Sequence, residues 1–303
     1  MTSSANKNNP TLPMLIIALD DRVDLCAEVL STTGEPAAAE REQAANLKRV
    51  VFDGITTAIE SGLAKSSVGI WADSDLGESV LLRAKAMSLT TASSPGSGLN
   101  SLGKLNVDYT AVQLTFNPDG PKVASVELLA RLKIVSDKAR DESIPLMIEL
   151  DTVPTTTQIE MYGSTSDARA MSLLTAIQQL QDAGVDPAIW AIEPAEDDVF
   201  TAAIAAQAHV DDRTGKVLFV VSGELADGQV GTGLNENDKR VIHLAARTHG
   251  VSGVVVGPGA YFRQLVQLNE GIIERSEAVD AIAAQLNDIS EIFVKSQAAS
   301  EVR

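Results

Sequence analysis

The chain has 303 residues, of which 45% are hydrophobic, and it carries a formal net charge of −17 at pH 7. The acidic balance disfavours a nucleic-acid backbone or an anionic membrane surface as a partner, because the electrostatic attraction would have the wrong sign. The single Cys26 excludes an internal disulfide, no apolar run reaches the roughly 18 residues that span a bilayer, and the first residues show no secretory signal, so a cytoplasmic protein is expected.

Short apolar runs recur along the chain and predict the buried strands of a parallel sheet, because such strands have no polar face. In chain order, we expect strands near residues 12–19, 67–72, 88–92, 109–115, 144–150, 188–193, 216–222 and 252–257. Several runs end in a carboxylate, which places Asp20, Asp73, Glu149 and Glu193 at carboxyl ends of strands.

Between these runs, apolar residues at helical spacing predict helices at 44–61, 123–140, 168–183, 236–249 and 275–294. Strands that alternate with helices predict a single (β/α)8 TIM barrel over residues 12–295, with disordered tails at 1–11 and 296–303. An open doubly wound sheet is the alternative, but its glycine-rich loop would follow the first strand, where this chain has Asp20, Asp21 and Arg22. Residues 93–107 show no helix pattern and predict a loop over the rim.

Acidic residues are expected at the carboxyl-end rim, where barrels of this kind place their chemistry. Asp20, Arg22, Glu149 and Glu193 are candidate catalytic residues, because clustered carboxylates raise one another's pKa into a range useful for proton transfer. Asp73 and Glu193 are also candidate ligands of Mg²⁺ or Mn²⁺, the cofactors that this acidic pattern suggests. The structural alternative is that these acids cap helices and pair with cations.

Glycines follow the last two predicted strands, where related barrels often bind phosphate through backbone N–H groups. Ser222 and Gly223 end the seventh strand, and Gly257 ends the eighth. Glycine lets an anion approach the backbone closely, so Ser222, Gly223 and Gly257 are candidate phosphate-binding residues. Ordinary turn formation explains the same glycines equally well.

Six segments resemble, in order and spacing, those of one enzyme family. They are residues 18–22 (ALDDR), 73–77 (DSDLG), 116–119 (FNPD), 145–150 (PLMIEL), 184–193 (GVDPAIWAIE) and 253–262 (GVVVGPGAYF). With them the chain resembles the class I tagatose-bisphosphate aldolases, and more closely the 2-deoxy-5-keto-gluconate 6-phosphate aldolase-like domain found beside the sugar kinase of inositol catabolism. The resemblance covers residues 12–290 and implies a (β/α)8 fold and a phosphorylated sugar as substrate.

The sequence departs from that family at three functional positions. The lysine that forms the Schiff base corresponds to Ala191, a second lysine on the fourth strand corresponds to Gln113, and an arginine after the last glycine corresponds to Pro258. The resemblance still implies that Gln113 lies at the substrate. Class I cleavage needs an amine to form the iminium that accepts electrons, and neither alanine nor glutamine supplies one.

Two functions stay open at this point. The first is a carbon–carbon lyase that acts on a small sugar or sugar phosphate, either with a relocated lysine or without an iminium. Lys122 and Lys216 are the nearest lysines, although Lys216 would lie at the wrong end of its strand. The second is an inactive, aldolase-like pseudoenzyme that binds a metabolite or a partner protein. Nucleic acid and membrane are not expected partners, and a homo-oligomer is an open alternative to a monomer.

Overall fold

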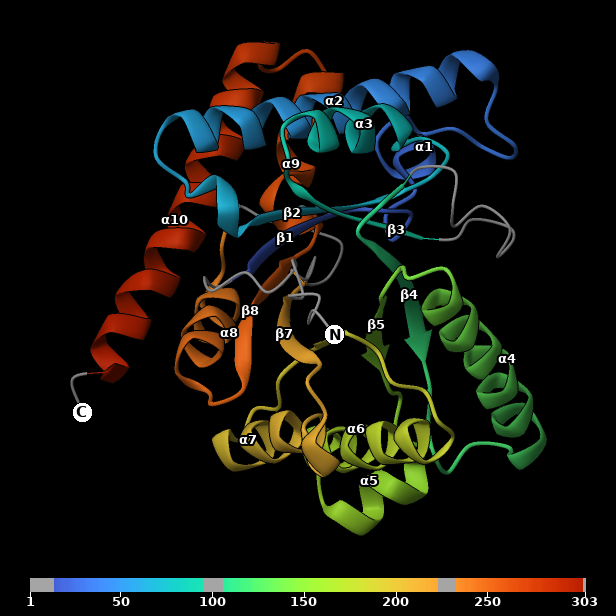
Figure 1. Cartoon of the computed structure of the whole chain (residues 1–303). Helices are drawn as coiled ribbons and strands as arrows, with labels where there is room; N and C mark the ends of the chain where they lie inside the picture. The colour runs from blue at the N-terminus through green and yellow to red at the C-terminus, as the bar shows by residue number, and fades with distance from the viewer. Residues whose placement is uncertain (1–13, 95–105, 223–232, 302–303) are drawn as a thin grey trace, which may run out of the picture.

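Eight parallel strands close into one barrel in a computed structural model that describes residues 14–94, 106–222 and 233–301 (Figure 1). Each strand pairs with its neighbours along the chain, and β1 also pairs with β8, which closes the barrel. This closure confirms the predicted (β/α)8 architecture and rules out the open sheet. The strands are β1 (Met14–Leu19), β2 (Val68–Asp73), β3 (Thr90–Ser94), β4 (Tyr109–Thr115), β5 (Leu146–Asp151), β6 (Ile189–Ile192), β7 (Lys216–Val221) and β8 (Val251–Val256).

Helices surround this barrel and connect its strands (Figure 1). All five predicted helices are present, and short ones that the periodicity did not reveal join them. Gly184 lies two residues after Asp182, which ends the helix predicted at 168–183, and adopts a positive φ of 78°, as a glycine that ends a helix does. The helices are α1 (Leu25–Glu28), α2 (Ala38–Glu60), α3 (Glu78–Ala86), α4 (Lys122–Asp141), α5 (Thr156–Tyr162), α6 (Thr165–Asp182), α7 (Asp198–Gln207), α8 (Glu236–Arg247), α9 (Phe262–Asn269) and α10 (Arg275–Glu301).

The predicted irregular segments at 296–303 and 93–107 overlap regular elements of the structure. Residues 296–301 are helical, because α10 continues to Glu301, so the predicted disordered tail at 296–303 is wrong over most of its length. The predicted loop at 93–107 begins inside β3, which ends at Ser94, and residues 95–105 lie outside the described part. The predicted tail at 1–11 also lies outside it.

Large and small side chains alternate inside the barrel. Trp71 of β2 is fully buried, and its register neighbours are Ala18 of β1 and Ala92 of β3, which leave space for the indole ring. Ala191 of β6 is also fully buried, and it stands in register beside Glu149 of β5. The methyl group at position 191 therefore lies next to a carboxylate at the top of the barrel core.

A second and larger apolar core lies between the strands and the helices. α10 packs along α2 and α8 and so joins the last helix to the first long one (Figure 1). Gly54 of α2 permits this packing, because a Cβ at that position would lie 2.7 Å from Cγ2 of Ile282. Within the described ranges, no helix combines the length and the apolarity that crossing a bilayer requires.

Candidate active site at the barrel mouth

The loop after β1 places Asp20 and Arg22 at the barrel mouth. Asp20 directly follows β1, and alternation from the interior residues Ile16 and Ala18 turns its side chain inward, where it is fully buried. Arg22 binds this carboxylate side-on, from Nε to Oδ1 at 2.6 Å and from Nη2 to Oδ2 at 3.1 Å. Such a bidentate pair fixes the plane of the guanidinium.

Arg22 also reaches Glu149, which lies on the opposite side of the barrel. Its Nη2 donates to Oε2 of Glu149 at 2.9 Å, and its Nη1 donates to Oε1 at 3.3 Å. β1 and β5 face each other in the closed barrel, so Arg22 bridges the mouth from wall to wall. Its Cζ lies 4.8 Å from the centroid of the Trp71 ring, and this cation–π contact forms the floor of the site.

One guanidinium therefore faces two carboxylates and can neutralise only one of them. Burial raises the pKa of Glu149, the charge of Arg22 opposes this shift, and the charge of Asp20 adds to it, with a net rise. Burial alone would lower the pKa of Arg22, but the two carboxylates outweigh it and keep the guanidinium charged. Gln113 is exposed and donates to Oε1 of Glu149 at 3.4 Å, so Glu149 lies at the open side of the mouth.

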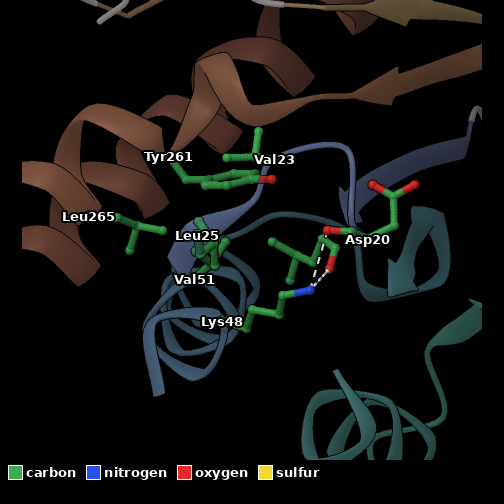
Figure 2. Close-up of a pocket in the computed structure, with 8 residues that line it drawn as sticks. Asp20, Val23, Leu25, Lys48, Val51, Tyr261 and Leu265 are labelled. Atoms are coloured by element: carbon green, nitrogen blue, oxygen red, sulfur yellow. Dashed lines mark hydrogen bonds between the residues drawn. The ribbon is translucent and has the colours of Figure 1, made fainter. Parts of the chain in front are cut away.

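Asp73, at the end of β2, is bound by a lysine that the sequence analysis missed. Lys48 of α2 pairs with the Asp73 carboxylate and donates to the backbone carbonyls of Leu19 at 2.7 Å and Asp20 at 3.3 Å. These three acceptors match the three donors of an ammonium group. Figure 2 shows Lys48 directed at the carbonyls, while the Asp20 carboxylate points away from it.

The surroundings of Lys48 leave no room for a substrate. Apolar side chains such as Val23, Val51 and Leu265 line the space around it, and that space holds no volume that a water molecule could occupy (Figure 2). A sequence signal existed, because Lys48 lies on the apolar face of its helix, four residues after Ala44 and three before Val51. Lys48 joins the ends of β1 and β2 and is part of the scaffold.

Glu193 belongs to a third ion-pair group, which lies at the same end of the barrel but on the side opposite β1 and β2. Arg169 of α6 binds Oε2 of Glu193 at 2.6 Å and Oδ1 of Asp151 at 2.7 Å. The two acids follow or end the neighbouring strands β6 and β5, so Arg169 joins these strands as Lys48 joins β1 and β2. All four rim acids, Asp20, Asp73, Glu149 and Glu193, therefore have a cation partner, as the structural alternative in the sequence analysis expects.

The structure separates the two residues proposed as metal ligands. Asp73 ends β2 and Glu193 follows β6, and these strands face each other across the barrel, so one ion cannot bind both side chains. Each acid also has its own buried or half-buried cation. Among the described residues, no group of three His, Cys, Asp or Glu side chains has the geometry to hold a metal. A role for Mg²⁺ or Mn²⁺ stays a prediction.

Neither Lys122 nor Lys216, the two lysines considered as replacements for the family amine, reaches the mouth. Ala191 points into the interior beside Glu149, as the resemblance implies for the family's lysine. Lys216 begins β7 and so lies at the opposite end of the barrel, and Lys122 is exposed at the first residue of α4. Lys104 lies outside the described residues.

Backbone packing accounts for Gly257, one of the candidate phosphate-binding residues. The N–H of Gly257 donates to the carbonyl of Val221 at 2.9 Å, so it is not free to bind an anion. A Cβ at position 257 would lie 2.9 Å from the carbonyl oxygen of Ser222, which accounts for the glycine. Ser222 follows β7 and is half-buried, and Gly223 lies outside the described residues.

Two of the family-like segments build the scaffold. Asp73 accepts the N–H groups of Asp75 and Leu76, which shapes the turn into α3. Asn117 donates to the carbonyl of Val153 at 2.8 Å and exchanges hydrogen bonds with the buried Gln158, so the loops after β4 and β5 are joined. These two segments therefore stabilise turns and loops of the barrel, and their resemblance to the family is evidence for the fold more than for the reaction.

Comparison with known proteins agrees with this fold. No protein-family model and no curated protein matches the sequence. The protein Cgl0159 of Corynebacterium glutamicum is similar with a TM-score of 0.51 and 14% identity, over 91% of this chain and 86% of that chain. A fructose-bisphosphate aldolase of Slackia heliotrinireducens is similar with a TM-score of 0.52 and 11% identity, over 90% and 86%. At such identity the likeness shows the fold alone, which is a (β/α)8 barrel.

Proposed function

We propose that this barrel is a lyase that cleaves a carbon–carbon bond in a small sugar or sugar phosphate without forming an iminium. The observation that carries the proposal is the bridge from Arg22 to Glu149 across the mouth, with Asp20 on the same guanidinium. A carboxyl group with a raised pKa beside a fixed cation suits proton transfer to and from a substrate. The bridge lies at the carboxyl end of the strands, where barrels of this class carry out catalysis.

The chemistry would be a reverse aldol reaction. Ionised Glu149 takes the proton of the hydroxyl group that lies β to the substrate carbonyl. The carbon–carbon bond breaks, the new carbonyl leaves as an aldehyde, and the electron pair passes to the other carbonyl as an enolate. Glu149 then returns its proton to the enolate carbon, so no oxidant or other reactant is needed. Arg22 stabilises the enolate oxygen electrostatically.

Arg22 retains one donor for this role. Of the five N–H groups of a guanidinium, four are directed at Asp20 and Glu149, and in the described chain the fifth, on Nη1, has no acceptor. Exposed Gln113 would bind a substrate hydroxyl beside Glu149. The methyl group of Ala191 supplies no amine at this point, which is why the proposal excludes an iminium.

The test is cleavage of a panel of ketose phosphates and free ketoses, read as release of aldehyde. Glu149→Gln should lower kcat/KM about 10²- to 10⁴-fold, because it removes the proton carrier and keeps the shape. Glu160→Gln on the exposed surface of α5 is the matched control and should leave the rate unchanged. Borohydride added with substrate should leave the mass of the protein unchanged. A trapped adduct on any lysine would show that an iminium forms and would contradict the proposed mechanism.

One observation favours the alternative of a barrel that binds without catalysis. Asp20 and Glu149 already occupy most of the Arg22 donors, so the bridge could serve to close the mouth. In that case no member of the panel is cleaved, and ligands raise the melting temperature by binding the folded state alone. The two functions therefore give opposite results in the same assay.

A further inference from the structure

A cleft lies outside the barrel mouth, between the beginnings of α6 and α8. It has a volume of about 560 Å³, which is within the range of pockets that hold small molecules. Ala170, Leu173 and Pro194 give it apolar surface, and Thr165, Asn235 and Arg240 give it polar groups. The mouth residues Asp20, Arg22 and Glu149 do not line this cleft.

Arg240 of α8 is held in this cleft by neutral acceptors. Its Nη1 donates to the carbonyl of Ala195 at 3.1 Å, and its Nη2 and Nε donate to Oδ1 of Asn237 at 3.0 and 3.2 Å. Among the described residues, no carboxylate forms an ion pair with it, whereas Arg169 on the opposite wall binds both Asp151 and Glu193. Three of the five N–H groups have acceptors in the described part of the chain, so this positioned guanidinium keeps two donors there for a ligand.

The charges around Arg240 decide what kind of anion fits. Glu193 and Glu196 also line the cleft, and Glu193 is already paired with Arg169. Arg240, which forms no ion pair within the described ranges, matches one negative charge, and the acidic neighbours Glu193 and Glu196 repel a second. A carboxylate carries one charge and accepts two parallel N–H groups from arginine, whereas a phosphate monoester carries about 1.5 to 2 charges at pH 7. Hydroxyl and amide groups of Thr165, Ser166 and Asn235 are suited to ligand hydroxyls.

We propose that this cleft binds a small hydroxylated monocarboxylate through Arg240, at a site separate from the barrel mouth. The apolar wall formed by Ala170, Leu173 and Pro194 would contact the carbon chain of the ligand. Asn237 is a positioning residue, because its Oδ1 accepts from Nε and Nη2 of Arg240 and so fixes the plane of the guanidinium. The proposal is independent of the lyase reaction, since it uses none of the residues that would carry it.

Calorimetric titration of the full chain tests the proposal, with gluconate, glucose, glucose 6-phosphate and inorganic phosphate as probes. Gluconate should bind more tightly than each of the others. Arg240→Gln should weaken gluconate binding about tenfold or more, because it removes a charged hydrogen-bond donor, and Asn237→Ala should weaken it less. Arg247→Gln is the matched control on the same helix, because Arg247 pairs with Asp198 and does not line the cleft.

Several results would overturn the proposal. Glucose binding as tightly as gluconate, or equal affinities in wild type and Arg240→Gln, would show that the cation does not select the ligand. Tighter binding of either phosphate would reject the carboxylate. Loss of gluconate binding in Glu149→Gln, with no loss in Arg240→Gln, would move the ligand to the barrel mouth. If melting curves show that Arg240→Gln does not fold, Arg240→Lys replaces it, since lysine keeps the charge and loses the bidentate geometry.

Discussion

Arg22 and Lys48 are both cations at the carboxyl end of β1 with little exposed surface, 11% for the Arg22 side chain and 3% for that of Lys48, yet they differ in what surrounds them. Lys48 has three acceptors for three donors and no space beside it. Arg22 shares its charge between two carboxylates, keeps one donor and lies beside the exposed Gln113. A saturated and sealed ion pair belongs to the scaffold, whereas a shared one at an opening leaves a carboxyl group whose protonation can change.

The largest expected effect comes from breaking the sealed pair. Lys48→Met should lower the free energy of unfolding by about 3–5 kcal/mol, because it leaves the Asp73 carboxylate and two carbonyls buried without their donor. Denaturant titration measures the loss. The exposed Lys65→Met should change stability by no more than about 0.5 kcal/mol. If the two variants are equally stable, Lys48 is not the scaffold contact that its geometry indicates.

A lysine introduced at position 191 tests whether an amine at the barrel mouth, beside Glu149, is enough to form an iminium. Ala191→Lys should cost about 1–3 kcal/mol of stability, because the site is fully buried, and should place an amine beside Glu149. With dihydroxyacetone phosphate and borohydride, we expect a trapped adduct in the variant and none in wild type. Intact mass measures both. An adduct in wild type, or none in a folded variant, would contradict the view that only the missing amine prevents iminium formation.

The raised pKa of Glu149 predicts how stability depends on pH. A carboxyl group whose pKa is raised on folding contributes stability below its unfolded pKa of about 4.3, and this contribution is lost as pH rises through the folded pKa. Glu149→Gln lacks the titrating group and does not lose this contribution. The melting temperature of the variant minus that of wild type should therefore increase as pH rises from about 4 towards 7. Glu160→Gln should follow wild type at every pH. If the melting temperature of Glu149→Gln minus that of wild type stays constant or falls as pH rises, Arg22 keeps Glu149 ionised.

The smallest expected effect concerns divalent cations. Asp73 and Glu193 each have a cation partner on opposite sides of the barrel. Millimolar Mn²⁺ should therefore change the melting temperature of wild type and of Glu193→Gln by similar, small amounts. A rise in wild type that Glu193→Gln abolishes would show that the ion displaces Arg169 and would restore the predicted metal site.

Local patterns in the sequence determined the elements and most of the barrel. Apolar runs of strand length and helical periodicity depend only on neighbouring residues, so the eight strands and five of the helices could be read directly. The carboxylates that end these apolar runs correctly placed Asp20, Asp73, Glu149 and Glu193 at one end of the barrel. The five helices that were not predicted, α1, α3, α5, α7 and α9, have at most 10 residues each, which is too short to show a clear period.

The pairing of charges was decided by the tertiary structure alone. Arg22 and Glu149 are 127 positions apart in the chain, and Lys48 and Asp73 are 25 apart, so nothing local links either pair. Closing the barrel brings β5 opposite β1 and brings α2 over the ends of β1 and β2. An ion pair needs its atoms within about 4 Å, a distance that only this packing sets. The sequence therefore determined which acids would reach the rim, and the closed fold decided which cation each of them meets.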